Sequence, residues 1–204
     1  MTKNIGCKKC RRLGFSVCGK EKCAVKRKPY APGIHGRKRG RRKNVSEYGL
    51  QLREKQRMRF LYGISEKQFR NYVEKALKQR RKDVVSYLAE SLESRLDNAV
   101  FKLGLAPTRK AARQMVNHGH ITVNGKVVNI PSYSLRVGDV VGLATKALAS
   151  GVTTNLDILL KKYEAPSWLE LMREKKAGKV VAKPSIDEFV KYHNIKPIIE
   201  HYLR

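Results

Sequence analysis

Residues 108–128 read TRKAARQMVNHGHITVNGKVV and combine a helix signal with a hairpin signal. Thr108 is a good N-cap residue, and the apolar side that follows it predicts a helix ending at His118-Gly119. Two short apolar runs then flank Asn124-Gly125, the strongest short hairpin signal, because both turn residues need a positive φ. The stretch therefore predicts a helix followed by an antiparallel hairpin, within an α+β fold.

Elements on both sides extend this pattern. Downstream, residues 135–141 predict another strand pair or a bend, and capping-box patterns at Ser167 and Ser185 predict two helices in the tail. Upstream, a single helix is predicted over residues 84–104, and Pro107 bars its continuation. The apolar stripe of that helix consists of Leu88, Leu92, Leu96, Val100 and Leu103.

Residues 45–82 have a helical pattern as well. A long basic helix is predicted to end at Tyr62-Gly63, and Ser65, three residues before Gln68, gives a capping-box start to the next helix. Apolar residues then fall on one face of that second helix. A pair of helices is the expected result.

The charge of the chain is its strongest functional signal. Its 45 Lys and Arg exceed its 17 Asp and Glu, which gives a formal net charge of +28. Self-repulsion of this size opposes compaction, so a polyanion such as nucleic acid is the predicted partner, and a membrane surface is the alternative. No apolar run reaches the ~18 residues of a membrane span, and the N-terminus lacks the apolar core of a secretory signal. The sequence thus predicts a cytoplasmic protein bound to RNA or DNA.

Residues 1–44 form a segment of their own. They show no helical or strand periodicity, and residues 1–43 hold 16 bases and one acid, a charge of +15 against +13 for the rest of the chain. We therefore expect an extended arm. Six of the seven residues 37–43 are basic and are predicted to contact RNA, with a merely solvated charge run as the alternative.

All four cysteines lie in this arm, at Cys7, Cys10, Cys18 and Cys23. A cytosolic chain is kept reduced, so the clustering favours a metal over disulfides, and two close pairs of thiolates suit a tetrahedral Zn²⁺. We predict one structural zinc per chain, whose binding would order a segment without a core. An iron–sulfur cluster, unliganded thiols and a redox disulfide are the alternatives.

Four stretches carry a family resemblance: residues 28–36 (KPYAPGIHG), 46–56 (SEYGLQLREKQ), 92–98 (LESRLDN) and 112–125 (ARQMVNHGHITVNG), the last continuing through 128–133. In this order, and over nearly the whole chain, they resemble bacterial-type small-subunit ribosomal protein four. Residues 198–204 resemble the family's C-terminus. The segment from about residue 144 to 197 resembles the family only loosely, apart from residues 166–169.

The resemblance implies a zinc-knotted arm (1–44), a helical lobe (45–91, continued by 144–204) and an RNA-binding domain of a helix pair plus an antiparallel hairpin sheet (92–143). It implies a primary ribosomal-RNA-binding protein that nucleates small-subunit assembly at a multi-helix junction. It also implies a place beside small-subunit proteins five and three, near the channel by which messenger RNA enters, and a contribution to translational accuracy. No membrane and no small-molecule substrate is implied.

The predicted RNA-binding residues come from the arm, the basic helix and the helix–hairpin stretch. The helix opening at Thr108 has free N–H groups and a positive dipole near several bases, which suits phosphate oxygens. The alternatives are that these bases only solubilise a helix and that the tyrosines are core residues. The full set is Tyr30, His35, Arg37, Lys38, Arg39, Arg41, Arg42, Lys43, Tyr48, Gln51, Arg53, Lys55, Arg57, Arg95, Thr108, Arg109, Lys110, Arg113, Gln114, His118, Asn124, Lys126, Ser132 and Tyr133.

Enzymatic interpretations have less support. Arg95-Leu96-Asp97 also occurs in pseudouridine synthases, where the Asp is the nucleophile, but here the triplet lies inside a predicted helix of the binding domain. The histidines are better explained by backbone or phosphate hydrogen bonds than by acid–base chemistry. An enzyme or stress factor that shares only this RNA-binding domain would lack the arm, the cysteines and the 46–56 helix. A generic nucleic-acid chaperone would have a low-complexity sequence, which this chain does not have. We predict a protein that is not an enzyme.

Overall fold

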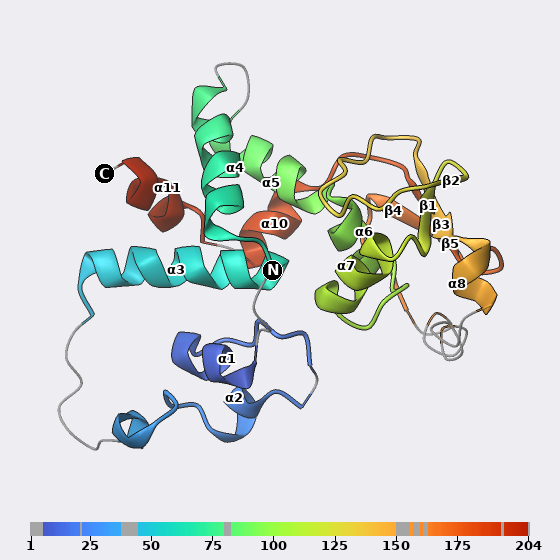
Figure 1. Cartoon of the computed structure of the whole chain (residues 1–204). Coiled ribbons are helices and arrows are strands. Elements are labelled where there is room, and N and C mark those ends of the chain that lie inside the picture. The colour runs from blue at the N-terminus through green and yellow to red at the C-terminus, as the bar shows by residue number, and fades with distance from the viewer. Residues whose placement is uncertain are drawn as a thin grey trace. The chain divides into compact units, whose positions relative to one another are not determined.

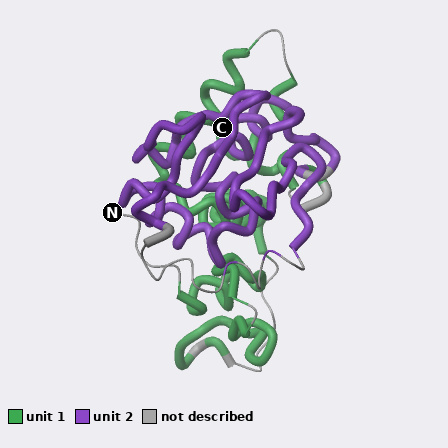
Figure 2. The backbone as a smooth tube through the Cα atoms, turned by 90° about the vertical axis from the view of Figure 1, so that its right-hand side faces the viewer, with its two compact units in different colours: residues 1–85, 190–204 green, residues 86–189 purple. Residues whose placement is uncertain are grey.

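The computed structural model describes residues 6–20, 22–37, 45–79, 83–149, 156, 160, 163–192 and 194–203. The chain divides into two compact units, taken separately below (Figure 2): unit 1 contains residues 1–85 and 190–204, and unit 2 contains residues 86–189. Helices and antiparallel strands together confirm the α+β class. None of the helices in the described ranges combines the length and the apolar composition that a membrane crossing requires.

Unit 1 is helical. It contains α1 (Cys7–Leu13), α2 (Ala24–Arg27), a 3₁₀ turn (Ile34–Arg37), α3 (Glu47–Tyr62), α4 (Glu66–Lys78) and α11 (Lys196–Leu203) (Figure 1). The expectation of an arm without helices is wrong for α1 and α2. With seven and four residues, both are too short to show an apolar periodicity in the sequence. Cys10, Val17 and Cys23 form a small buried cluster between them.

The predicted helix pair in residues 45–82 is confirmed. The Ser46 hydroxyl accepts a hydrogen bond from the Gly49 N–H at 3.2 Å, and the Ser65 hydroxyl accepts one from the Gln68 N–H at 3.2 Å. Both hydroxyls satisfy N–H groups that have no partner within their own helix. α3 ends at Gly63, as the sequence indicates.

A polar cluster around Glu66 fixes α11 to α3. One carboxylate oxygen of Glu66 accepts hydrogen bonds from Lys55 Nζ (2.7 Å) and the Tyr202 hydroxyl (3.0 Å), and the other lies 3.3 Å from Arg59 Nε. Burial acts to raise the pKa of Glu66, but Lys55, Tyr202 and Arg59 outweigh it and hold the pKa below its ordinary value. Lys55 is only 7% exposed, so this carboxylate offsets part of the cost of burying the ammonium group.

Replacing Glu66 by Gln should therefore loosen α11. The Glu66 side chain is 43% exposed, so solvent screening limits the expected loss at pH 7 to about 1 kcal/mol. A carboxyl whose folded pKa is lowered stabilises the fold above its unfolded pKa of ~4.3, and that stabilisation disappears as the pH falls through the folded value. Hydrogen exchange of the α11 amides should thus be faster in Glu66→Gln at pH 7, and the difference from wild type should shrink below pH ~4.

The matched control is Glu74→Gln in the same helix, which removes an exposed pair with Arg70 at 2.6 Å. That change should leave α11 exchange nearly unaltered, since exposed ion pairs contribute little. Equal exchange rates in the Glu66 and Glu74 variants would show that the cluster does not hold α11.

Unit 2 is built on one antiparallel sheet. Its strands are β1 (Ile121–Val123), β2 (Lys126–Val127), β3 (Val140–Leu143), β4 (Leu169–Met172) and β5 (Ala177–Val180), in the spatial order β2-β1-β3-β5-β4. Its helices are α5 (Val84–Glu93), α6 (Leu96–Lys102), α7 (Arg109–Asn117), α8 (Thr145–Ala149) and α10 (Ile186–Tyr192), of which α5 and α10 cross the unit limits. The predicted β1–β2 hairpin is confirmed, with φ of 51° at Asn124 and 79° at Gly125.

The predicted single helix over residues 84–104 is wrong, because the chain breaks between α5 and α6. Arg95 has an extended backbone (φ −62°, ψ 137°). Hydrogen bonds to a distant loop replace helical ones: the Leu135 N–H donates to the Ser94 carbonyl and the Leu96 N–H donates to the Tyr133 carbonyl, both at 2.9 Å. The apolar stripe continues across the break, so the sequence pattern does not reveal it.

The tail differs from the expectation in one place. Ser167 was predicted to start a helix, but residues 169–172 form β4, which pairs with β5, and β5 pairs with β3. Gly178 in β5 permits this sheet to lie directly on α6, since a Cβ there would overlap the buried Leu103 side chain. The helix predicted after Ser185 is confirmed as α10. Of the segment 144–204, which was expected to continue the helical lobe, residues 190–204 belong to unit 1 and residues 144–189 to unit 2.

Candidate nucleic-acid interface and metal centre

An ion pair is buried where α6 begins. Arg95 donates from Nε to Asp97 Oδ1 at 3.0 Å and from Nη2 to Oδ2 at 2.7 Å. The two residues are only 1% and 3% exposed. Arg113 of α7 approaches the same carboxylate, with 3.8 Å between its Nη1 and Asp97 Oδ2. One buried carboxylate thus serves an internal arginine and a partly exposed one.

A second polar chain runs beside the first. Asn98, 1% exposed, donates from Nδ2 to the Glu93 carboxylate at 2.7 Å and accepts from Arg109 Nε at 2.8 Å. The Arg109 guanidinium also lies over the Phe101 ring, 4.5 Å from its centroid. The plane of this guanidinium is therefore fixed from two sides. Glu93 and Asn98 were missed as site residues, although both lie in the quoted motif at 92–98 and are polar within an apolar stripe.

α7 has polar and basic residues on its outer side. Thr108 caps the helix, accepting from the Ala111 N–H at 3.2 Å, as predicted. Lys110, Gln114 and His118 follow one another at intervals of four residues and are exposed. Because free N–H groups and the positive end of the helix dipole lie beside the arginines, this end of α7 suits an anion.

The hairpin and the loop after it add further predicted residues. Lys126, Ser132 and Tyr133 are exposed in unit 2. Asn124 has a structural role, since its amide donates to Asp139 Oδ1 at 2.8 Å and its carbonyl accepts from the Val140 N–H at 2.9 Å.

Three predicted residues have side chains inside the protein. Arg95 is buried against Asp97, and Lys55 is buried against Glu66. Gln51, 2% exposed, donates to Glu200 of α11 at 3.2 Å. These side chains stabilise the two units from within.

Two predicted arginines of α3 hold the cysteine segment, by which we mean the described part of residues 6–31. Arg53 donates from Nε and Nη2 to the Leu13 carbonyl at the end of α1 (2.9 and 2.6 Å). Arg57 places its guanidinium 3.8 Å from the centroid of the Phe15 ring. Both therefore attach α1 to α3 within unit 1.

The other predicted residues of unit 1 take no part in the contacts between α1 and α3 described above. Tyr30 lies under the guanidinium of Arg11, 4.7 Å from its ring centroid, and Tyr48 is 51% exposed. The backbone of His35 and Arg37 forms the 3₁₀ turn, and their side chains lie outside the described part. Lys38, Arg39, Arg41, Arg42 and Lys43 lie outside the described residues altogether.

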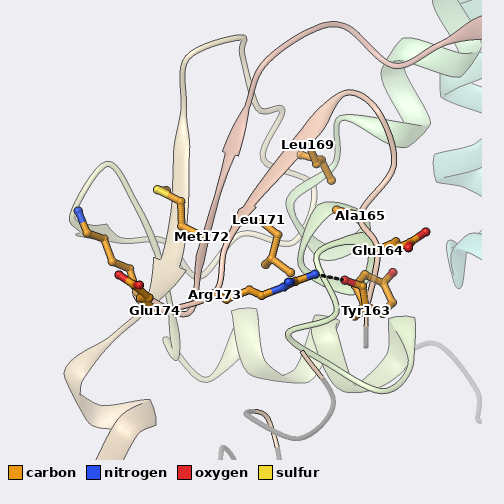
Figure 3. A pocket seen from close by; sticks show the side chains of 9 residues that line it. Tyr163, Glu164, Ala165, Leu169, Leu171, Met172, Arg173 and Glu174 are labelled. Carbon is orange, nitrogen blue, oxygen red and sulfur yellow. Dashed lines mark hydrogen bonds between the residues drawn. The ribbon is translucent and has the colours of Figure 1, made fainter. Parts of the chain in front are cut away.

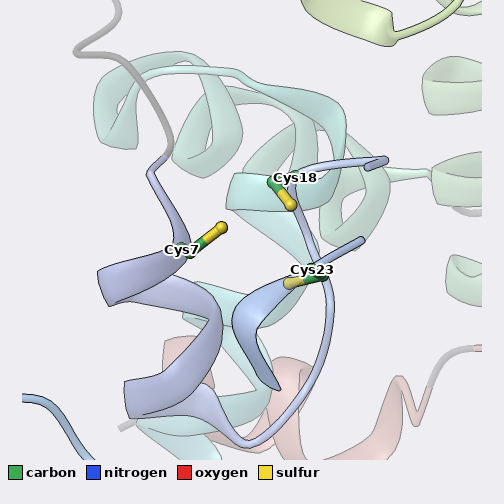
Figure 4. Close-up of side chains that lie close together, drawn as sticks. All are labelled: Cys7, Cys18 and Cys23. Carbon is green, nitrogen blue, oxygen red and sulfur yellow. The ribbon is translucent and has the colours of Figure 1, made fainter. Parts of the chain in front are cut away.

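The cysteines lie close together in unit 1. The thiols of Cys7, which opens α1, Cys18, in the loop, and Cys23, which precedes α2, are all within 4.8 Å of one another (Figure 4). Cys10 is fully buried beside them, and its Sγ accepts from the Val17 N–H at 3.4 Å. All four are free thiols.

This donor set fits a soft, four-coordinate cation. Thiolates 2.3 Å from a tetrahedral Zn²⁺ stand roughly 3.8 Å apart, a spacing that three of these thiols already approach. Burial raises the pKa of Cys10 to about 12, and the neighbouring thiols add to the rise. Burial acts on Cys23 in the same direction, but hydrogen bonds with Ser16, Val25 and other cysteines lower its pKa to about 7. The lowered pKa of Cys23 favours its thiolate, the form that binds metals.

An open hollow lies in unit 2 beside β4 (Figure 3). Arg173 crosses it and donates to the Tyr163 carbonyl at 3.3 Å. The described residues that line it include no histidine, cysteine or serine. They are Tyr163, Glu164, Ala165, Leu169, Leu171, Met172, Arg173, Glu174 and Lys175.

The chain matches two domain families, which together span residues 2–141. The ribosomal protein S4/S9 N-terminal domain matches residues 2–93, and the S4 domain matches residues 94–141. A small ribosomal subunit protein uS4 from Akkermansia muciniphila is 45% identical, over 95% of this chain and 94% of the relative. Proteins of the same name from Syntrophomonas wolfei and Acetivibrio thermocellus are 43% and 47% identical, over 97% and 89% of this chain and 96% and 88% of the relatives. The resemblance found in the sequence is confirmed: the chain belongs to the family of small ribosomal subunit protein uS4.

Proposed function

We propose that the chain is a structural component of the small ribosomal subunit and that it binds ribosomal RNA through the outer face of α7 and the β1–β2 hairpin. One observation carries the proposal: at the capped end of α7 the buried Asn98 accepts a hydrogen bond from Arg109, and one helical turn later Arg113 lies 3.8 Å from the buried carboxylate of Asp97. Bases held in this way suit phosphate groups of a folded RNA. The family is structural and non-enzymatic, and no catalytic role is part of the proposal.

Neighbouring residues extend this interface. Lys110, Gln114, His118 and Lys126 would add polar contacts, and an exposed Tyr133 would stack on an unpaired base. The arm bases at residues 37–43 would form a second contact by charge alone. Gln51, Lys55 and Arg95 are not included, because their side chains are buried.

The proposal also includes more specific roles, which are suggested by membership of the family. They are nucleation of subunit assembly at a multi-helix RNA junction, a contribution to translational accuracy near the path of messenger RNA, and contacts with small-subunit proteins five and three in the cytoplasm. The hollow beside β4 supports a protein contact in the tail. Its lining includes Met172, Arg173 and Tyr163, and these residue types are enriched in protein interfaces.

The proposal also includes one structural Zn²⁺, held by Cys7, Cys10, Cys18 and Cys23. The close approach of three of the thiols and the burial of the fourth support it. With four protein ligands the ion would have no position for a substrate, so it would supply folding energy alone.

Selective binding to RNA tests the main proposal. The chain should bind a transcript of the 5′ part of small-subunit ribosomal RNA about ten-fold or more tighter than a transcript of the 3′ part at equal salt, since specific sites exceed non-specific ones by at least this factor. Filter binding at physiological salt measures both affinities. Equal affinities for the two transcripts would mean that the net charge alone attracts RNA and would contradict the proposal.

A further inference from the structure

The two arginines of α7 are constrained in a way that most surface bases are not. An arginine has five N–H donors in a rigid plane, so holding its Nε fixes the directions of the other donors. Asn98 holds Arg109 in this manner by accepting from its Nε, and Glu93 orients Asn98 in turn. Asp97, which Arg95 orients, draws Arg113 toward the same side of α7.

We infer that Asp97 and Asn98 are positioning residues for RNA binding, acting through Arg113 and Arg109 respectively. This inference rests on the proposed function. Neither residue would touch RNA, because both are buried. Their effect is to hold two long side chains in the orientation that binds phosphate, so that less side-chain freedom is lost on binding. For one such side chain this is worth about 2–10-fold in affinity.

For Asp97, simple electrostatics and the positioning role predict opposite changes in RNA affinity. A carboxylate near an RNA phosphate repels it, so Asp97→Asn would strengthen binding if charge alone mattered. If Asp97 positions Arg113, the same substitution weakens binding. The sign of the change therefore separates positioning from charge.

The experiment measures binding to a transcript of the 5′ part of small-subunit ribosomal RNA in double-mutant cycles. We expect Asp97→Asn and Asn98→Ala each to weaken binding by about 5-fold in the wild-type background. The same substitutions should have almost no effect when Arg113→Ala or Arg109→Ala, respectively, is already present. A purely structural role would weaken binding equally in both backgrounds and would overturn the inference.

A second variant is useful because Asp97→Asn also leaves the buried Arg95 without its counter-ion and can unfold unit 2. Arg109 lies on the partly exposed side of α7. The substitution Arg109→Lys keeps the positive charge but removes the Nε–H group that donates to Asn98. It should weaken binding by about 5-fold. The control Arg136→Lys, at an exposed residue of unit 2, should bind within about 2-fold of wild type. Wild-type affinity in Arg109→Lys would overturn the inference.

The binding data distinguish a failure of the proposed function from a failure of the positioning roles. If the wild-type chain does not prefer this transcript, the function itself is wrong and the inference with it. The wild type can instead prefer the 5′ transcript, with binding weakened by Arg109→Ala but not by Arg109→Lys or Asn98→Ala. In that case only the positioning roles are wrong.

Discussion

Replacing both Arg109 and Arg113 by Ala should weaken binding to the 5′ ribosomal RNA transcript by somewhat less than roughly 2–6 kcal/mol, the sum of the two single losses. The loss of one charge-assisted hydrogen bond at an interface is worth roughly 1–3 kcal/mol. The two residues are one helical turn apart and are held by adjacent buried residues, so the double variant should fall short of the sum of the single ones.

The salt dependence gives an independent measure of the same contacts. Each phosphate contact that is lost should lower the log–log slope of affinity against salt by ~0.7–0.9, because fewer counterions are released. A titration of each variant from low to physiological salt measures the slope. The control is Lys175→Ala, which removes an exposed charge at the β4–β5 turn of the same unit and should change the slope much less. If both arginine variants keep the wild-type slope, α7 does not bind the RNA backbone.

Helices and turns with local signals could be predicted from the sequence. The caps at Ser65 and Thr108 and the Asn124-Gly125 turn involve residues at most three apart, and the structure contains all of them. Features that depend on distant partners could not be predicted. The break before α6 is made by hydrogen bonds to the loop around Tyr133, some 40 residues along the chain.

The candidate site shows the same limit. Pattern and charge marked α3 as a basic helix, but they could not tell which of its faces meets α11. Gln51 points inward and donates to Glu200, which lies 149 residues later in the chain. No local pattern around Gln51 could have indicated so distant a partner. Similarly, Arg53 and Arg57 were predicted as RNA contacts from their charge, whereas their partners are Leu13 and Phe15 in the cysteine segment.

If Cys7, Cys10, Cys18 and Cys23 hold the proposed zinc, removing it should have the largest effect on stability. Structural zinc sites in small domains supply about 10–16 kcal/mol of folding free energy at neutral pH. The buried cluster of the cysteine segment consists of Cys10, Val17 and Cys23, which is too little apolar burial to offset the conformational entropy of some 25 residues. Without the ion, residues 6–31 should lose their structure.

Cys10→Ser tests this expectation, because it removes the most deeply buried thiol of the cluster. Elemental analysis of the metal-replete wild type should find one zinc per chain, and the variant should contain much less. Hydrogen exchange should become fast in α1 and α2, and the contacts of Arg53 with Leu13 and of Arg57 with Phe15 should be lost. Unit 2 has its own core and should keep its thermal unfolding midpoint.

Two controls separate the metal from other causes. Lys20→Ala changes an exposed residue between Cys18 and Cys23 and should leave both the zinc content and the exchange unchanged. Arg53→Ala should retain the zinc yet loosen the attachment of α1 to α3, because it removes two hydrogen bonds to Leu13 without touching a thiol. The contrary result would be a wild-type protein, produced in medium that contains zinc, without stoichiometric metal and with α1 still protected from hydrogen exchange. Packing alone would then order the cysteine segment.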